Sequence, residues 1–460
     1  MRLKSLAILL ALSASTTVLA GGKKAPPHPI FDAVAPINAP PDVTSNPWFT
    51  PGFDIQLSQF TGQPITYGND VKLLVTGKEI YPEILERIKN AHETIDFQNY
   101  LWRDDESGLA VAHALADAAT RGVRVRLIMD WTNAFKHDQA YKIMADAGIE
   151  NLVYNQAFWG IGDVNKRLHE KLMIMDGSVS LQGGVNMANE YLIDTEKERL
   201  WQDLMFEMRG PIVAQMQKRY DYVWNWMATL DFRARMHAAQ TYGGAGSVFK
   251  QYTIYHDPTP TSSAPAPGAS SRAILQHQQP YLYAGQGDVY ADMYAGIIDQ
   301  AKERLILYVP YLAPNPTFFN AIIRAARDRH VDTTLITNSA QTNDMAFILV
   351  NAALGHYSKL MKVGVKIYER TESTLHAKAI LVDRKALTVG SHNFTHRSFH
   401  ENGEANVMTD DPQAIARFEQ MFNENISSFQ QVTPQDLKNR IDSLTEQVGL
   451  VVGRWLEDLF

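Results

Sequence analysis

The sequence HEKLMIMD at residues 169–176 returns as HAKAILVD at residues 376–383, with its histidine, lysine and aspartate at the same spacing. Each copy is followed by a turn that contains glycine and asparagine, GGVN at residues 183–186 and GSHN at residues 390–393. One such motif is weak evidence, because short patterns occur by chance in unrelated chains. Two copies with matching tails indicate that a whole domain has been duplicated.

The helices and strands expected around the two motifs follow the same order. Before the first motif, hydrophobic periodicity predicts a helix at 81–91, a strand at 94–100, a helix at 109–121 and a strand at 123–129. Before the second motif it predicts helices at 294–301 and 318–327, and strands at 305–309 and 333–337. This alternation is typical of an α/β fold. We therefore expect two duplicated α/β domains, each a mixed, mostly parallel sheet flanked by helices.

The composition along the chain divides it into six expected segments. They are a signal peptide at 1–20, an extended N-terminal arm at 21–69, a first domain at 70–240, a flexible linker at 241–272, a second domain at 273–427 and a C-terminal helical segment at 428–460. The arm and the linker are inferred from their content of Pro, Gly, Ala and Ser. We expect the C-terminal segment to pack on the second domain, with contact to a membrane surface as the alternative.

The N-terminal residues have the pattern of a secretory signal. Arg2 and Lys4 precede an apolar run, and small or aliphatic residues at 18–20 offer a cleavage site. The run is short for a bilayer span, which takes about 20 apolar residues, so an uncleaved membrane anchor is the weaker alternative. The pattern predicts an exported protein that is periplasmic or secreted.

The overall composition excludes several kinds of site. The chain has no cysteine, which excludes disulfides, thiolate metal sites and a cysteine nucleophile. Its formal net charge of −7 argues mildly against a general nucleic-acid binder, since such proteins usually carry a basic surface. Nothing in the motifs requires a metal ion or a cofactor, and we expect neither.

The residues of the two motifs suit chemistry on a phosphodiester. Such a reaction needs a nucleophile, an acid for the leaving oxygen and fixed positive charge around the phosphoryl group. Two imidazoles can provide the first two functions, two lysines the charge, and two asparagines amide donors. On a strand, a histidine and a lysine two positions apart face the same side. The candidate catalytic residues are therefore His169, Lys171, Asn186, His376, Lys378 and Asn393.

The two aspartates of the motifs are expected to have a different role. Asp176 and Asp383 lie at an odd offset from the lysines, so on a strand they point to the opposite face. We interpret them as structural residues that order the adjoining turn.

The doubled motif resembles the phospholipase D superfamily, whose members build one active site from two such motifs. The resemblance covers roughly residues 70–427. It implies that the two domains pack face to face around one cleft and that catalysis passes through a covalent phosphohistidine. It also implies His169 as nucleophile and His376 as general acid, with the reverse assignment as the alternative. A carboxylate behind each histidine is part of the same resemblance, and Asp203 and Glu404 match those positions.

Within the superfamily, the sequence is most similar to bacterial cardiolipin synthases. The similarity rests on residues 183–191, 201–204, 335–344, 390–393, 397–398 and 402–404. The sequence departs from their pattern at Thr395, where an aspartate is common, and in having a predicted signal peptide in place of N-terminal membrane helices.

These observations predict an enzyme that acts on phospholipids at a membrane surface, by phosphatidyl transfer to an alcohol or by phospholipase D hydrolysis with water. Gly184, Ser391, Phe158 and Trp159 are expected to contact the substrate, with Phe158 and Trp159 along an acyl path or, alternatively, in ordinary core. The alternatives are a metal-independent secreted endonuclease, which would bind nucleic acid, and a non-catalytic envelope scaffold. A monomer is possible because both motifs lie in one chain.

Overall fold

The computed structural model describes residues 48–130, 138–154, 166–195, 199–242, 261–262, 264–279, 286–344 and 347–442. The predicted signal peptide, most of the predicted linker, and the pair Phe158 and Trp159 lie outside these residues. We refer to residues 66–242 as the first half and to residues 271–442 as the second half.

The first half follows a short helix, α2 (Pro51–Thr61). Its strands are β1 (Thr66–Leu74), β2 (Thr94–Asn99), β3 (Arg124–Asp130), β4 (Glu150–Tyr154), β5 (Arg167–Leu168), β6 (Leu172–Met175), β7 (Val179–Gly183) and β8 (Met205–Arg209). Its helices are α3 (Gly77–Lys89), α4 (Glu106–Thr120), α6 (Asp138–Asp146), α7 (Asn189–Leu192) and the long α8 (Pro211–Tyr242).

The second half repeats this order. Its strands are β9 (Ser271–Gln278), β10 (Arg304–Tyr308), β11 (Asp332–Asn338), β12 (Lys366–Arg370), β13 (Ala379–Val382), β14 (Ala386–Gly390), β15 (Asn402–Thr409) and β16 (Gln430–Gln431). Its helices are α9 (Gln286–Asp299), α10 (Pro316–Asp328), α11 (Phe347–Lys362), α12 (His396–His400), α13 (Pro412–Asn425), the 3₁₀ turn η3 (Ile426–Ser428) and α14 (Pro434–Asp442).

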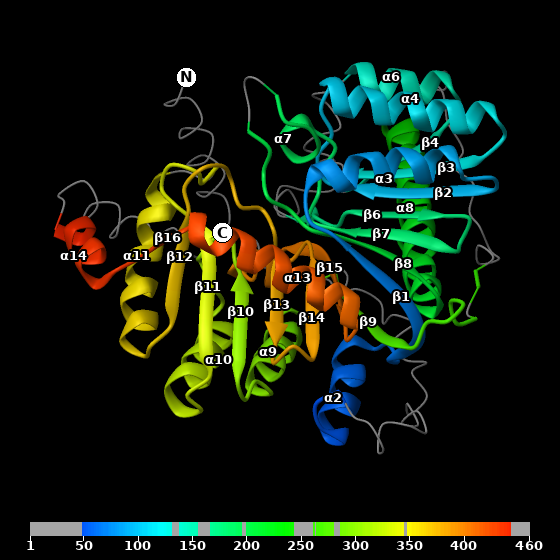
Figure 1. Cartoon of the computed structure of the whole chain (residues 1–460). Coiled ribbons are helices and arrows are strands. Elements are labelled where there is room, and N and C mark those ends of the chain that lie inside the picture. The colour runs from blue at the N-terminus through cyan, green and yellow to red at the C-terminus, as the bar shows by residue number, and fades with distance from the viewer. Residues whose placement is uncertain are drawn as a thin grey trace.

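The two halves form one continuous mixed sheet (Figure 1). Strand β1 of the first half pairs antiparallel with β9 of the second, which joins the two sheets. Along the main path of the sheet, parallel pairs are confined to β2–β3–β4 and β10–β11–β12. Antiparallel pairs outnumber them, contrary to the expected mostly parallel arrangement, because the chain continues after each motif as a meander, β6–β7–β8 or β13–β14–β15.

Each half has a core of its own on one face of the sheet, and both share a core on the other face. Helices α3, α4 and α6 cover the first half, while α9, α10 and α11 cover the second. On the opposite face, α8 and α13 pack over strands of both halves in one hydrophobic cluster. Because burial of apolar surface is the main stabilising term, this shared core holds the halves in a fixed relation.

Helix α2 corrects the expectation of an extended arm at residues 21–69. The side chain of Thr50 accepts a hydrogen bond from Phe53 N, a proline occupies the start of the helix, and Gly62 ends it with a left-handed φ of 63°. These are standard signals for a helix start and stop. Phe53 and Leu57 are buried against the second half, so part of the expected arm belongs to its core.

The described part of the C-terminal segment packs on the second half. Leu437 of α14 joins the core there, and Arg440 lies 2.7 Å from Glu369 of β12. Residues 443–460 lie outside the described residues.

Candidate active site

The two histidine–lysine pairs lie directly before β6 and β13, where the two halves meet. All four side chains are buried. In each pair the lysine Nζ donates a hydrogen bond of 2.5 Å to the carbonyl of its own histidine, Lys171 to His169 and Lys378 to His376. The lysine thus folds back against the histidine two residues before it, which keeps the charge close to the imidazole.

Each histidine is bound to a carboxylate of the opposite half. His169 Nδ1 lies 2.9 Å from Glu404 Oε2, and His376 Nδ1 lies 2.6 Å from Asp203 Oδ2. Because an ionised carboxylate can only accept, each Nδ1 is the donor and each Nε2 is left to act on a substrate. The sequence predicted both carboxylates but not that they cross between the halves.

Backbone hydrogen bonds between the two halves hold these histidine–carboxylate pairs in place. His169 N donates to Gly403 O at 2.9 Å, beside the short parallel pairing of β5 with β15. On the other side, His376 N donates to Gln202 O at 2.8 Å. The residue before each carboxylate, Gly403 or Gln202, therefore accepts a backbone hydrogen bond from the histidine that this carboxylate orients.

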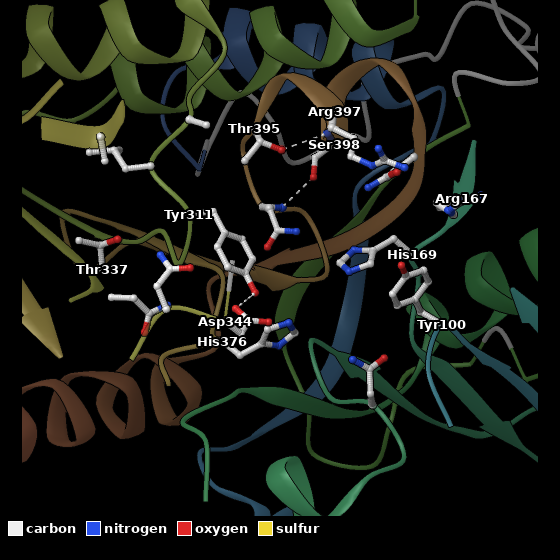
Figure 2. Close-up of a pocket in the computed structure, with 18 of the residues that line it drawn as sticks. Tyr100, Arg167, His169, Tyr311, Thr337, Asp344, His376, Thr395, Arg397 and Ser398 are labelled. Atoms are coloured by element: carbon white, nitrogen blue, oxygen red, sulfur yellow. Dashed lines mark hydrogen bonds between the residues drawn. The ribbon is translucent and has the colours of Figure 1, made fainter. Parts of the chain in front are cut away.

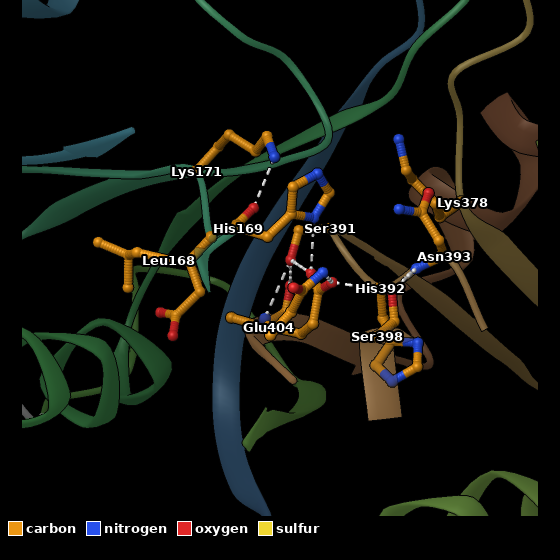
Figure 3. A network of polar contacts seen from close by, with 12 residues as sticks. Leu168, His169, Lys171, Lys378, Ser391, His392, Asn393, Ser398 and Glu404 are labelled. Carbon is orange, nitrogen blue, oxygen red and sulfur yellow. Dashed lines mark hydrogen bonds and ion pairs between the residues drawn. The ribbon is translucent and has the colours of Figure 1, made fainter. Parts of the chain in front are cut away.

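Glu404 accepts hydrogen bonds from four side chains (Figure 3). Its Oε2 accepts from His169 and, at 2.6 Å, from Ser391 Oγ. Its Oε1 accepts from Ser398 Oγ at 2.9 Å and Asn402 Nδ2 at 3.1 Å. A carboxylate with this many donors is held rigidly and kept ionised.

Asp203 is supported in a simpler way. Besides its contact with His376, Asp203 accepts a hydrogen bond of 2.8 Å from the backbone N of Leu204. Gly184 occupies the place that corresponds to Ser391, and a Cβ there would lie 2.3 Å from Asp203 Oδ1. The glycine therefore makes room for the shorter carboxylate, whereas the serine binds the longer one.

The electrostatics keep both imidazoles neutral in the free protein. Burial lowers the pKa of His169 to about 4, although Glu404 opposes this shift. Burial and the adjacent Lys378 lower the pKa of His376 to about 3. Burial alone would raise the pKa of Glu404, but its electrostatic interaction and hydrogen bond with His169 lower it to about 2.

The lysines are also shifted. Burial lowers the pKa of Lys378 to about 8, and burial together with Lys378 lowers that of Lys171 well below its usual value. The positive charge of one buried lysine disfavours protonation of the other. An anion bound between them would reverse the effect, so the site is arranged to gain protons when it binds a phosphoryl group.

Both histidines open into one cavity of about 390 Å³ between the halves (Figure 2). Asn186 and Asn393, which the sequence suggests as catalytic residues, line this cavity together with the histidines. The other lining residues are Tyr100, Leu101, Arg167, Tyr191, Tyr311, Leu312, Ala313, Thr337, Asn338, Asn343, Asp344, Ala353, Tyr357, Thr395, Arg397, Ser398 and Asn402. The lysines of the two motifs and the carboxylates that bind the histidines, Asp203 and Glu404, do not belong to the lining.

Two predicted substrate contacts are placed elsewhere. Gly184 and Ser391 do not belong to the lining and instead contact Asp203 and Glu404. Their physical role is to position a carboxylate. The path expected along Phe158 and Trp159 stays a prediction, since both residues lie outside the described part of the chain.

The motif aspartates bind backbone amides on the far side of each motif. Asp176 accepts from the N–H groups of residues 92–94, and Asp383 accepts from those of residues 302–304. Both adopt a left-handed backbone, with φ of 51° and 49°. They hold the start of β2 or β10 against the turn that follows the motif.

The cavity also contains residues that the motifs did not single out for a role in the site. Tyr100 packs edge-on against His169 with ring centroids 4.9 Å apart, and Tyr191 does the same against His376 at 5.0 Å. Arg167 lies two residues before the first motif, whereas Asp344 lies far from either motif in the sequence. Proximity to a motif could have suggested Arg167, but only the fold brings Asp344 to the cavity.

Comparison with known proteins identifies the repeated unit. The family described as "Cardiolipin synthase, PLD-like domain" matches residues 84–224 and 294–426, once in each half. The cardiolipin synthase of Geobacillus thermodenitrificans is 27% identical over 77% of this chain and 65% of its own length. That of Listeria monocytogenes serotype 4a is 28% identical over 81% of this chain and 72% of its own length. These matches confirm the predicted resemblance.

The fold recurs in a solved structure. The phosphatidylserine synthase of Haemophilus influenzae Rd KW20 superposes with a TM-score of 0.62 and 14% identity, over 88% of this chain and 97% of its own. At this identity the likeness shows the fold alone. The chain spans about two thirds of the length of the first curated relatives, 65% and 63%.

The comparisons correct the predicted location. The relatives are cardiolipin synthases, which are membrane-anchored enzymes of the cytoplasmic side, so the prediction of a periplasmic or secreted protein is wrong. The residues on which that prediction rested lie outside the described part of the chain. Among the described helices, none is long and apolar enough to cross a membrane. Within the same residues no group of three His, Cys, Asp or Glu side chains could hold a metal ion.

Proposed function

Because the chain belongs to the cardiolipin synthase type of the PLD-like domain family, we propose that it transfers phosphatidyl groups from a phospholipid to an alcohol, with water as the competing acceptor. The proposal places His169, Lys171, Asn186 and Asp203 of the first half and His376, Lys378, Asn393 and Glu404 of the second half in one catalytic set. The observation that carries it is the pair of histidines in one cavity, each oriented by a carboxylate of the other half.

His169 is the proposed nucleophile. When its Nε2 bonds to phosphorus, the imidazole becomes cationic while Nδ1 keeps its proton. A fixed, ionised carboxylate on Nδ1 stabilises that cation. Glu404 fits this task better than Asp203, because four side-chain donors hold it and its pKa is about 2.

His376 is the proposed acid and base on the opposite side of the phosphoryl group. Its pKa of about 3 in the free protein leaves it neutral at pH 7. A phosphodiester brings a negative charge next to it, which raises the pKa of an imidazole. The proton then passes from His376 to the leaving alcohol. In the second step the entering alcohol returns a proton to His376 as its oxygen displaces His169 from phosphorus.

The lysines and asparagines are proposed to bind the phosphoryl oxygens. Lys171 and Lys378 supply charge in a buried site where it acts strongly. Asn186 and Asn393 line the cavity beside them and can donate amide hydrogens. These groups are in place before the substrate arrives, which favours stabilisation of the charge that develops in the transition state.

The test is mass spectrometry of products from the purified full chain, incubated without added metal. Vesicles of phosphatidylglycerol and phosphatidylethanolamine form one arm, plasmid DNA forms the other, and His169→Ala is the control. Cardiolipin or phosphatidic acid from the wild type only is the expected result. Nicked DNA with unchanged lipid would instead assign the cavity to an endonuclease.

A further inference from the structure

Among the described residues that line the cavity, the one acidic side chain is Asp344, on the side of His376. Asp344 lines the wall together with Tyr311, whose hydroxyl donates a 2.8 Å hydrogen bond to Asp344 Oδ1. The Tyr311 ring lies edge-on to His376, with centroids 6.5 Å apart (Figure 2). Asp344 also acts on the catalytic groups, because its charge raises the pKa of Lys378 against the effect of burial.

The wall beside His169 has the opposite charge. Arg167 and Arg397 line the cavity there, near Tyr100 (Figure 2). The two side chains lie near each other (Figure 2), and burial together with the neighbouring Arg167 lowers the pKa of Arg397. The cavity between the two halves is therefore cationic on the side of His169 and carries a carboxylate on the side of His376.

A carboxylate at this place is unsuited to the phosphoryl group. It would repel the substrate anion, which the lysines and arginines attract. It is suited to hydroxyl groups, because an ionised carboxylate accepts several hydrogen bonds and donates none. On the side of His376, where the alcohol leaves and enters in the proposed function, Asp344 can accept from hydroxyls that do not react.

We propose that Asp344 and Tyr311 form a headgroup subsite that selects uncharged alcohols with a second hydroxyl, of the glycerol class, and excludes alcohols that carry a carboxylate. This inference rests on the proposed phosphatidyl transfer with His376 on the alcohol side. One hydroxyl of the acceptor forms the new P–O bond as the bond from phosphorus to His169 Nε2 breaks, and its proton passes to His376. A second hydroxyl donates to Asp344, while Tyr311 holds that carboxylate in position.

Alcohols of similar size and different charge provide the test. Phosphatidylglycerol vesicles are incubated with equimolar free glycerol and glycerate at saturating total concentration, and the two phosphatidyl products are measured against phosphatidic acid. Phosphatidylglycerol with a headgroup-labelled glycerol distinguishes new product from donor. We expect the wild type to prefer glycerol by about tenfold or more, since the negative charge of Asp344 repels the carboxylate of glycerate.

Asp344→Asn should lower this preference at least about fivefold, because the amide removes the repulsion of glycerate. Asp344→Glu keeps the charge and should retain the preference for glycerol. The matched control is Asp332→Asn, an exposed aspartate at the opposite end of β11. Tyr311→Phe should raise the KM for glycerol by a larger factor than the factor by which it lowers the rate of phosphatidic acid formation.

Three outcomes would overturn the inference. An unchanged ratio in Asp344→Asn, with phosphatidic acid still formed, would refute the subsite and leave the proposed function standing. In a parallel competition of ethanolamine with glycerol, a preference of the wild type for ethanolamine above about tenfold would assign the carboxylate to an ammonium headgroup instead. If the wild type consumed no lipid at all, the proposed function would fail and this inference with it.

Discussion

The two halves of the molecule solve the same problem with different residues. Both place a histidine and a lysine before a central strand, and both receive a carboxylate from across the junction. In one direction Ser391, Ser398 and Asn402 surround Glu404 with donors. In the other, Gly184 leaves space for Asp203, which has a backbone amide as its further partner. Duplication preserved the geometry of the histidine–lysine pairs, while the groups that support the two carboxylates diverged, which fits the unequal tasks that we propose for the two histidines.

The largest effect is expected from removing either histidine. His169→Ala and His376→Ala should each lower steady-state turnover by at least about 10³-fold, because nucleophile and acid–base catalyst act as a unit. The two variants should differ with phosphatidyl-p-nitrophenol, whose leaving group needs no acid. His376→Ala should release one equivalent of p-nitrophenolate and retain a phosphatidyl adduct on the peptide that contains His169.

Mass spectrometry of the quenched proteins distinguishes the two assignments. No adduct is expected in His169→Ala, and unfolding is monitored by circular dichroism in both variants. An adduct on His376 in the His169→Ala protein would reverse the roles that we propose for the two halves.

The two carboxylates should differ in importance. Glu404→Gln should reduce kcat by about 10²–10³-fold, because the amide no longer stabilises a cationic phosphohistidine. Asp203→Asn should cost about tenfold, in the range usual for residues that orient a ligand or catalyst from behind. Single-turnover kinetics with the same activated lipid compare the two directly. A larger loss in Asp203→Asn would show that the better-supported carboxylate is not the one that serves the nucleophile.

The buried histidines should make the fold sensitive to acid. Their pKa values of about 4 and about 3 lie below the 6.5 of an unfolded histidine, so the unfolded chain binds more protons between these limits. The contribution of these two histidines to the free energy of unfolding is therefore fully present above pH 6.5 and is lost as the pH falls below it. Between pH 7 and pH 5 each histidine should reduce the free energy of unfolding by about 1–2 kcal/mol.

Thermal denaturation at these two pH values measures the effect. His169→Asn and His376→Asn should each flatten the dependence of Tm on pH, and the double variant should flatten it most. A wild-type slope that persists in the double variant would locate the acid sensitivity elsewhere.

The smallest effect is expected from the residues that differ between the two supports. Ser391→Ala removes one of four donors to Glu404 and should lower kcat by about three- to tenfold, since one hydrogen bond to a charged group contributes modestly when others remain. Ser428→Ala, at an exposed position of η3, is the control. A loss as large as that of Glu404→Gln would mean that Ser391 contributes more than its hydrogen bond to the carboxylate.

The repeated motif was enough to predict the duplicated α/β fold and to suggest six residues of the proposed catalytic set, while Asp203 and Glu404 were suggested by the resemblance to the phospholipase D superfamily. Helix α2 was missed because its Pro- and Gly-rich surroundings resembled a linker, although Thr50 and Gly62 mark its ends. The crossing of Asp203 and Glu404 could not be derived from the sequence, because spacing along the chain says nothing about which half a side chain faces. Asp344 falls within residues 335–344, which are similar to cardiolipin synthases, but no local pattern indicates that it reaches the cavity.

The pairing of each histidine with a carboxylate of the other half also bears on how the chain folds during its synthesis. Proteins emerge from the ribosome N-terminal end first and fold as they emerge. A nascent chain that ends after β8 carries a complete histidine–lysine motif, yet the glutamate that orients its histidine lies almost 200 residues further on, at position 404. The first half by itself therefore has a histidine that no carboxylate holds in place. The proposed reactivity toward lipids therefore requires the strand that carries Glu404, and a chain that ends before this strand lacks it.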